Sequence, residues 1–168
     1  FVHEGGIATP LIVHWPDGIS ERGNLRHHTG QLMDIMATIV DVSGLDWPQE
    51  RDGLPILPVE GSSLKNTFNS HDQNRPPLAW EHEGNCASRE GKWKLVKRWD
   101  REDWELYDMD VDRCEINDLT NTYPETRAEL VEKYHDWANR VGVVEWNQLE
   151  ATRNAKGIFT DWMPHPHD

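Results

Sequence analysis

The stretch that decides the fold is residues 78–108, LAWEHEGNCASREGKWKLVKRWDREDWELYD. It holds four short strand-like pieces, separated by segments of three or four residues. Two of these segments contain a glycine, and their lengths are typical of hairpin loops. The strands expected from this pattern are residues 78–82, 86–89, 93–99 and 104–108. We therefore predict a four-stranded antiparallel meander.

An amphipathic helix is expected directly after the sheet. Thr122 and Glu125 form a capping box at its start, and Gly142 ends it. A sheet with one apolar face and an amphipathic helix bury each other, so the helix is predicted to pack on the sheet. The residues after Trp146 are polar and predict a loosely held tail. The apolar face of the helix comprises Leu130, Tyr134, Trp137, Ala138 and Val141.

The residues before the sheet indicate an α/β domain. Residues 7–15, IATPLIVHW, form a β-branched and aliphatic run typical of a strand covered on both faces. Residues 32–43 carry apolar side chains at helical spacing, with Thr29 as the expected N-cap and Gly44 as the stop. Residues 46–77 hold seven Pro or Gly and predict an ordered connector.

Charge and composition exclude several classes of partner. The chain has 30 Asp or Glu against 17 Lys or Arg, a formal net charge of −13. Nucleic-acid binding needs clustered Lys and Arg, and so does adsorption to an anionic membrane surface. No apolar run approaches the roughly 20 residues of a spanning helix. We therefore predict no nucleic-acid partner and no membrane partner.

The segment from Trp80 to Glu83 is the clearest candidate for polar chemistry. Alternation along a strand places Glu81 and Glu83 on one face and Trp80 with His82 on the other. Two carboxylates and an imidazole so close together could form part of a polar pocket. The alternative is a strand end with solvated charges around a packed tryptophan.

The two cysteines, Cys86 and Cys114, cannot form a four-ligand zinc site on their own, and their spacing matches no zinc signature. A disulfide between them and two free thiols are both open from the sequence.

Several stretches together resemble the C-terminal part of a type I sulfatase, of the arylsulfatase group in the alkaline phosphatase superfamily. Residues 3–16, HEGGIATPLIVHWP, are similar to a family segment in which Glu-Gly-Gly precedes a strand ending in Trp-Pro. Residues 32–44 resemble a family helix that ends at glycine. The pieces that resemble its C-terminal subdomain are residues 80–85, 91–96, 104–108 and 115–119. The resemblance covers residue 1 to about residue 146, in the family's order.

This resemblance implies an α/β fold with two parts. Residues 1–75 would be the end of an alkaline-phosphatase-like α/β sulfatase domain. Residues 76–168 would be a C-terminal subdomain with a four-stranded antiparallel sheet, a packed helix over about 123–141, and the polar tail. Family members are often exported, which implies a periplasmic or extracellular location.

The implied activity is the hydrolysis of sulfate esters, either aryl or carbohydrate sulfates. In the family, the formylglycine nucleophile, the Ca²⁺ ligands and most sulfate-binding side chains precede the Glu-Gly-Gly segment. The chain begins at Phe1 and is expected to be a fragment that follows them, with no catalytic residue and no metal ligand of its own. It would form part of the substrate-pocket wall and be inactive alone. Its implied partners are the missing N-terminal catalytic portion, with Ca²⁺ and formylglycine, and a sulfated small molecule or glycan.

Four residues are expected to contact substrate by this resemblance: His82, Glu81, His3 and Asn85. His3 precedes Glu4-Gly5-Gly6, whose glycines allow a tight turn near the cleft. The strand with Glu81 and His82, followed by Asn85, could cover the same cleft.

Two other functions remain open from the sequence. One is a non-catalytic β module that binds carbohydrate or protein through its nine tryptophans. The other is a phosphoesterase of the same superfamily. The sulfatase nucleophile motif is Cys-x-Pro-x-Arg, whereas Cys86-Ala-Ser-Arg89 has no proline and has its arginine one place early. Cys86 is therefore interpreted as an ordinary strand residue.

Overall fold

The computed structural model describes residues 1–70 and 75–156. The chain is an α/β protein that divides into two compact units. One unit is residues 10–76, and the other combines residues 1–9 with the chain from Pro77 onward. The first nine residues thus group with the sheet. That residues 1–75 close a sulfatase domain and residues 76–168 form its subdomain stays a prediction.

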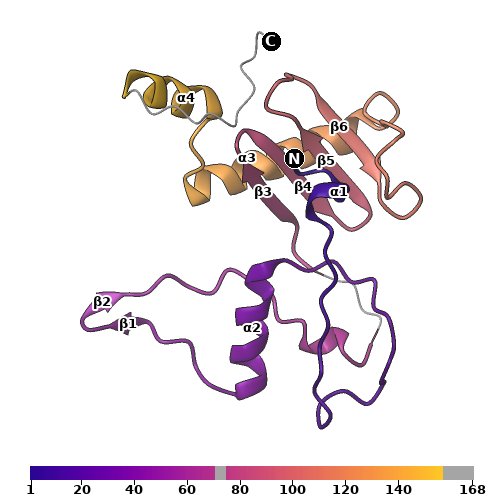
Figure 1. Cartoon of the computed structure of the whole chain (residues 1–168), viewed down its shortest axis with the longest axis vertical. Helices are drawn as coiled ribbons and strands as arrows, with labels where there is room; N and C mark the ends of the chain where they lie inside the picture. The colour runs from indigo at the N-terminus through magenta and orange to yellow at the C-terminus, as the bar shows by residue number, and fades with distance from the viewer. Residues whose placement is uncertain (71–74, 157–168) are drawn as a thin grey trace. The chain divides into compact units, whose positions relative to one another are not determined.

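The predicted meander is confirmed. A four-stranded antiparallel sheet runs in chain order through β3 (Leu78–His82), β4 (Asn85–Glu90), β5 (Trp93–Lys97) and β6 (Trp104–Asp108), as Figure 1 shows. The turn between β3 and β4 consists of Glu83 and Gly84, with φ values of 52° and 78°. Two consecutive left-handed residues are typical of the tight hairpin turn that matches the twist of paired strands.

One face of the sheet is covered by α3 (Pro124–Val141), as expected. Leu130 packs with Leu95 and Leu106 in one buried cluster, and Tyr134 and Ala138 pack with Ala79 in another. Gly142 ends the helix with a φ of 75°. The predicted capping box is wrong, because Tyr123 is the N-cap and makes no side-chain cap bond. Pro124 takes the first helical position, where its missing N–H costs no hydrogen bond.

The other face of the sheet is covered by the start of the chain, which the sequence did not predict. Val2 is buried in a cluster with Ala87, Val96, Tyr107 and Met109, and Trp80 packs against it. The short helix α1 (Glu4–Ile7) follows and lies beside the sheet in Figure 1. The sheet is therefore buried on both faces.

The polar tail contains a helix that was not predicted, α4 (Trp146–Ala155). A Cβ added to Gly84 would lie 2.7 Å from Cγ of Trp146, so the first residue of α4 packs on the β3–β4 turn. This contact attaches the start of α4 to the sheet. The rest of the predicted tail, residues 157–168, lies outside the described residues.

The unit of residues 10–76 contains α2 (Leu32–Ser43), a hairpin of β1 (Glu50–Arg51) and β2 (Leu54–Pro55), and the 3₁₀ helix η1 (Lys65–Thr67). The predicted helix and its glycine stop are confirmed, because Gly44 has a φ of 66°. The predicted N-cap is wrong. Gln31 caps the helix instead of Thr29, and the Gln31 N–H donates a hydrogen bond to Oδ2 of Asp34.

The predicted strand over residues 7–15 is wrong. Ile7 ends α1, and residues 8–15 have no strand geometry. A strand needs a neighbour to accept its ladder hydrogen bonds, and none of the described residues pairs with this segment. Leu11, Ile12 and Val13 are exposed as a result, with Ile12 89% accessible.

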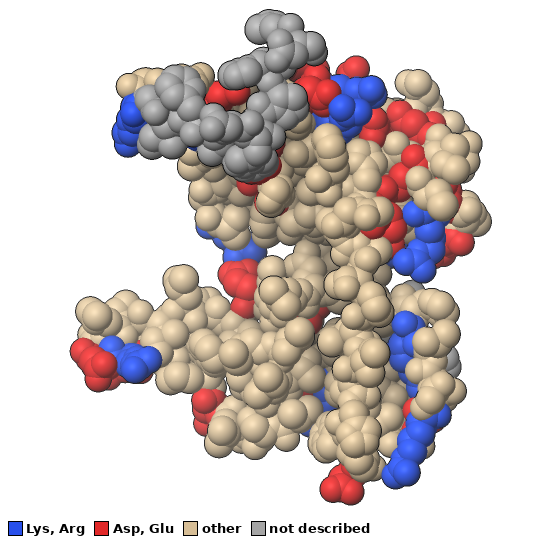
Figure 2. Space-filling view, in the orientation of Figure 1, with Lys and Arg blue, Asp and Glu red and all other residues tan. Residues whose placement is uncertain are grey.

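The apolar face of α2 is likewise exposed in this chain. Leu32, Met36 and Ile39 all face solvent, and the buried residue of the helix is Asp34. Figure 2 shows much uncharged surface over this unit. None of the helices that the structure describes has the length and apolar character that crossing a bilayer requires.

Candidate functional site

The most buried charge in the sheet unit is Lys94 on β5. Its side chain has no exposed surface and lies on the face covered by residues 1–9. Its Nζ is 2.7 Å from Oε1 of Glu115 and 3.5 Å from Oε2 of Glu4. Lysine is almost never fully buried unless it is paired, because an isolated ammonium loses its hydration. The two carboxylates supply that pairing.

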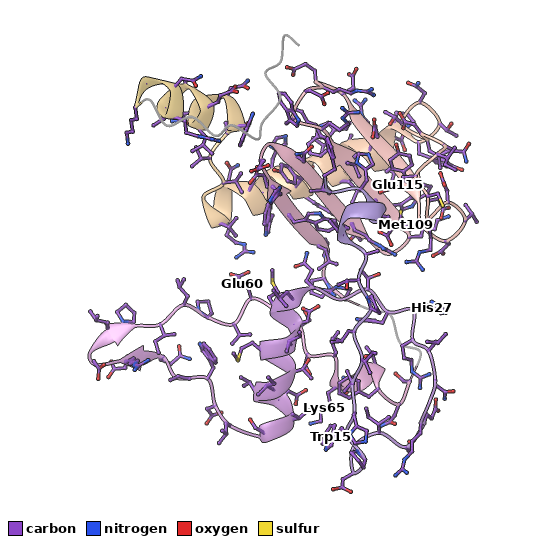
Figure 3. All side chains as sticks on the ribbon, viewed as in Figure 1. Trp15, His27, Glu60, Lys65, Met109 and Glu115 are labelled. Atoms are coloured by element: carbon purple, nitrogen blue, oxygen red, sulfur yellow. The ribbon has the colours of Figure 1, made fainter. Side chains whose placement is uncertain are left out.

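Arg113 completes this group of charges. Its Nη2 donates to Oε1 of Glu4 over 2.9 Å, and the backbone N–H of Glu4 donates to Oε2 of Glu115. Burial raises the pKa of Glu4, but the hydrogen bond from Arg113 and the charge of Lys94 outweigh it and hold that pKa below its ordinary value. Glu4, Lys94, Arg113 and Glu115 are called the Lys94 network below. Figure 3 labels Glu115, which lies near α1.

An open depression borders the network. It is lined by Glu4, Gly5, Ala8, Arg113 and Cys114. The Glu4-Gly5-Gly6 segment therefore forms part of a concave surface, and Arg113 brings a cation to its edge. Sequence reasoning did not single out Arg113 or Lys94. The available signal was the strand alternation that places Lys94 on the same face as Val96, a buried apolar residue.

His3, which precedes α1, contacts a carboxylate on β6. Its Nε2 lies 3.0 Å from Oε2 of Glu105 on β6, and the Tyr107 hydroxyl donates to the same oxygen over 3.1 Å. The His3 and Tyr107 rings also meet edge to face, with centroids 6.4 Å apart. Glu105 and Tyr107 therefore fix the orientation of the imidazole.

His82 is exposed at the end of β3. Its side chain is 70% accessible, and its Nδ1 lies 3.9 Å from Oε2 of Glu83. The neighbouring Glu81 has a structural role, because its Oε1 accepts the Gly84 N–H over 2.6 Å. The His82 ring can therefore meet a ligand without breaking the turn.

Asn85 is buried beneath the same turn. Its Nδ2 donates to the carbonyl oxygens of His82 and Glu83 over 3.0 and 3.3 Å. Its Oδ1 accepts the Trp99 N–H over 3.4 Å. The side-chain amide is therefore committed to holding the β3–β4 turn.

The structure does not bring all four predicted contact residues together. Glu81, His82 and Asn85 share one end of the β3–β4 hairpin, whereas His3 is bonded to β6 at the opposite edge of the sheet. Substrate contact by any of them stays a prediction. Cys86 and Cys114 form no disulfide, and burial raises the pKa of the Cys86 thiol. Among residues 1–70 and 75–156, no three His, Cys, Asp or Glu side chains gather as a metal site.

The family is decided by a match over residues 1–140 to the family model described as N-sulphoglucosamine sulphohydrolase, C-terminal. The chain belongs to this sulfatase C-terminal family. It is 27% identical to an uncharacterized sulfatase of Schizosaccharomyces pombe, over 86% of this chain and 27% of that protein. It is 28% identical to N-acetylgalactosamine-6-sulfatase of Rattus norvegicus, over 77% of this chain and 24% of that protein.

Human arylsulfatase K is 26% identical, over 82% of this chain and 27% of that protein. The chain thus spans about a quarter of the length of the curated relatives it matches. Among solved structures, the crystal structure of Ps i-CgsB aligns with a TM-score of 0.58 at 19% identity. That alignment covers 74% of this chain and 27% of the other, and it supports the fold.

Proposed function

We propose that this sulfatase-family chain is the C-terminal part of an enzyme that hydrolyses sulfate esters, and that it forms part of the wall of the substrate pocket. Family membership and the sulfatase relatives support the reaction class. A sulfated glycan is the substrate class we favour over an aryl sulfate. One relative is named for N-acetylgalactosamine 6-sulfate chemistry, and Ps i-CgsB has also been solved with k-i-k-neocarrahexaose.

The observation that carries the pocket-wall role is the attachment of Glu4-Gly5-Gly6 to the sheet. The Lys94 network joins this segment to β5 and to the loop after β6. Glu4 and Gly5 of the segment line an open depression, and Gly5, which has no side chain, allows close approach to its backbone. A wall of this kind holds a substrate in position without supplying the nucleophile.

The nucleophile and the metal belong, in this proposal, to the portion of the protein N-terminal to Glu4-Gly5-Gly6. We expect a formylglycine and Ca²⁺ there, and the described residues of this chain offer no cluster that fits Ca²⁺. The chemistry expected from that portion is covalent attack on sulfur, with stabilisation of the sulfate oxygens. No step of that chemistry is assigned to this chain.

The residues of this chain would bind and orient substrate. The exposed imidazole of His82 can donate a hydrogen bond to a sulfate or sugar oxygen. His3, oriented by Glu105, presents a second imidazole next to the Glu4-Gly5-Gly6 segment. Glu81 and Asn85 act through the turn that they close, so we interpret them as positioning residues.

The test uses the full-length protein that contains this chain. It is incubated with 4-nitrophenyl sulfate, with a panel of sulfated glycan oligosaccharides and with 4-nitrophenyl phosphate, and released sulfate and phosphate are measured by ion chromatography. We expect sulfate release, faster from the glycans than from the aryl ester. Phosphate release without sulfate release would show a phosphoesterase and contradict the proposal.

A further inference from the structure

We propose that Lys94 is a positioning residue that fixes the Glu4-Gly5-Gly6 segment on the sheet, so that the geometry of the pocket wall depends on a buried ion pair. The structure alone gives the position of the segment. The effect of Lys94 on catalysis, by contrast, rests on the proposed sulfatase function. Neither the family resemblance nor any local sequence motif assigns such a role to Lys94.

The contacts of Lys94 join three parts of the chain that are remote in sequence. Glu4 precedes Lys94 by 90 residues, and Glu115 lies on the irregular segment after β6. Glu115 uses both carboxylate oxygens, one toward the Lys94 ammonium and one toward the backbone N–H of Glu4. The carboxylate therefore fixes the backbone of the segment as well as its side chain.

The carboxylates of this network are largely buried, so their charges depend on the partners that surround them. The Glu115 side chain is 3% exposed and that of Glu4 is 13% exposed. Replacing a buried ion pair with apolar side chains is often neutral or stabilising, so packing alone does not require charges here. What the hydrogen bonds from Lys94 and Arg113 to Glu4, and from the Glu4 N–H to Glu115, add is direction, because each one specifies where its partner atoms lie.

The backbone on both sides of this contact is constrained. Glu115 has a φ of 54°, a left-handed conformation that persists in a non-glycine residue when its surroundings hold it. A Cβ added to Gly6 would lie 2.4 Å from the carbonyl oxygen of Phe1, so the turn is tight. A Cβ added to Gly5 would meet no described atom within 4 Å, and Gly5 lines the depression. The network thus presents the accessible backbone of Gly5 in one fixed place.

Removing the ammonium should release this geometry. In Lys94→Met, Arg113 and Arg89 are the cations that still act on Glu4. The carboxylates of Glu4 and Glu115 remain close together without the ammonium between them, and their repulsion drives Glu4 away from Glu115. In the double variant Lys94→Met/Glu115→Gln, the charges of Glu4 and Arg113 balance again. Stability should then recover, but the ammonium contact that holds Glu4 is still absent.

The experiment measures three quantities on the full-length protein: hydrogen–deuterium exchange of residues 1–9, the melting temperature, and kcat with KM for sulfate release. For Lys94→Met we expect at least tenfold faster exchange in residues 4–6, with β3–β4 and α3 protected as in the wild type, and at least a tenfold lower kcat. In the double variant the melting temperature should return toward the wild-type value while fast exchange and low kcat persist. Lys92→Met is the matched control, because Lys92 pairs with Asp108 and not with the segment.

Three results would overturn the proposal. They are unchanged exchange in residues 4–6 of Lys94→Met, recovery of protection and kcat together with the melting temperature in the double variant, and an equal effect of Lys92→Met. If the wild-type protein releases no sulfate, the proposed function fails. The exchange measurement still decides whether Lys94 positions the segment.

Discussion

Nη1 of Arg75 lies 2.9 Å from Oδ2 of Asp34, a carboxylate without exposed surface. The same oxygen accepts the Gln31 N–H over 2.7 Å, and Oδ1 accepts the Ser62 N–H over 2.8 Å. One buried carboxylate thus joins the start of α2 to two distant segments of the unit of residues 10–76. A Cβ added to Gly61 would lie 2.3 Å from the Met33 carbonyl oxygen, so the chain passes close to the helix at this point.

The first prediction concerns acid stability. Burial raises the pKa of Asp34, but the bonds from Arg75, Gln31 and Ser62 outweigh it and hold that pKa below its ordinary 3.8. Because the folded pKa is depressed, this stabilisation is present above the unfolded pKa, about 3.9, and is lost as pH falls through the folded value. Asp34→Asn should therefore lower the free energy of unfolding by about 1.5–3 kcal/mol at pH 7, measured by urea denaturation.

The difference between Asp34→Asn and wild type should shrink as the pH is lowered below about 3.9. Asp41→Asn is the control, because Asp41 is exposed and pairs with Lys65 at the surface. Surface pairs contribute little, so the urea midpoint of this control should barely move. Equal losses in the two variants would show that Asp34 does not hold the unit together.

The second prediction concerns how α3 docks on the sheet. Leu130 is 1% exposed between Leu95 and Leu106, so Leu130→Ala should destabilise by about 2–5 kcal/mol. Trp137 packs only partly buried against the cluster of Tyr134 and Ala138, so Trp137→Ala should cost less than the roughly 3–5 kcal/mol of a fully buried tryptophan. Thermal and urea unfolding measure both. An unchanged free energy of unfolding in Leu130→Ala would mean that the helix docks through another face.

The third prediction separates turn strain from packing. Gly84 and Gly91 both have positive φ, but an added Cβ at Gly84 would meet Trp146 and Trp99, and one at Gly91 would meet no described atom within 4 Å. Gly91→Ala should cost about 1–2 kcal/mol from the left-handed backbone alone. Gly84→Ala should lower the free energy of unfolding by about 1–3 kcal/mol more than Gly91→Ala does, because the added methyl group overpacks the contact with the two tryptophans. Equal losses would show that α4 does not pack on the turn.

The elements that the sequence predicted are those specified by neighbouring residues. The meander, α2 and α3 follow from alternation, helical spacing and terminal glycines, which act over a few residues. The coverage of the second sheet face was missed because Val2 packs in a cluster with Val96, which lies far away in the sequence. The strand at residues 7–15 was wrong because strand formation depends on a partner that a single segment does not reveal.

In the candidate site, too, the residues predicted from the sequence belong to one local motif, and those that were missed depend on distant contacts. His82, Glu81 and Asn85 were predicted as contact residues from one short motif, and their contact with substrate stays a prediction. The motif did not show that Glu81 and Asn85 close the turn. Lys94 was missed because its carboxylates come from Glu4 and Glu115, far away in sequence. A lysine on an apolar strand face predicts a need for partners, but it does not say where they come from.

The fourth prediction tests substrate contact by His82. Because its side chain is 70% exposed and lies outside the buried clusters, His82→Ala in the full-length protein should leave the melting temperature nearly unchanged. Loss of a substrate hydrogen bond should lower kcat/KM by about 10-fold or more, because a hydrogen bond to a charged group such as a sulfate contributes roughly 1.5–3 kcal/mol. Asn85→Ala is the contrast, since it removes buried bonds and should lower the melting temperature. Wild-type kinetics in His82→Ala would end the contact hypothesis.

The most direct measurement of the central claim compares sulfate release by the 168-residue chain and by the full-length protein. Both are assayed with 4-nitrophenyl sulfate and with sulfated glycan oligosaccharides, with and without Ca²⁺. The pocket-wall account predicts sulfate release by the full-length protein and none by the chain. Turnover by the chain above background, persisting after repurification, would show that it carries catalytic groups of its own and would contradict the account.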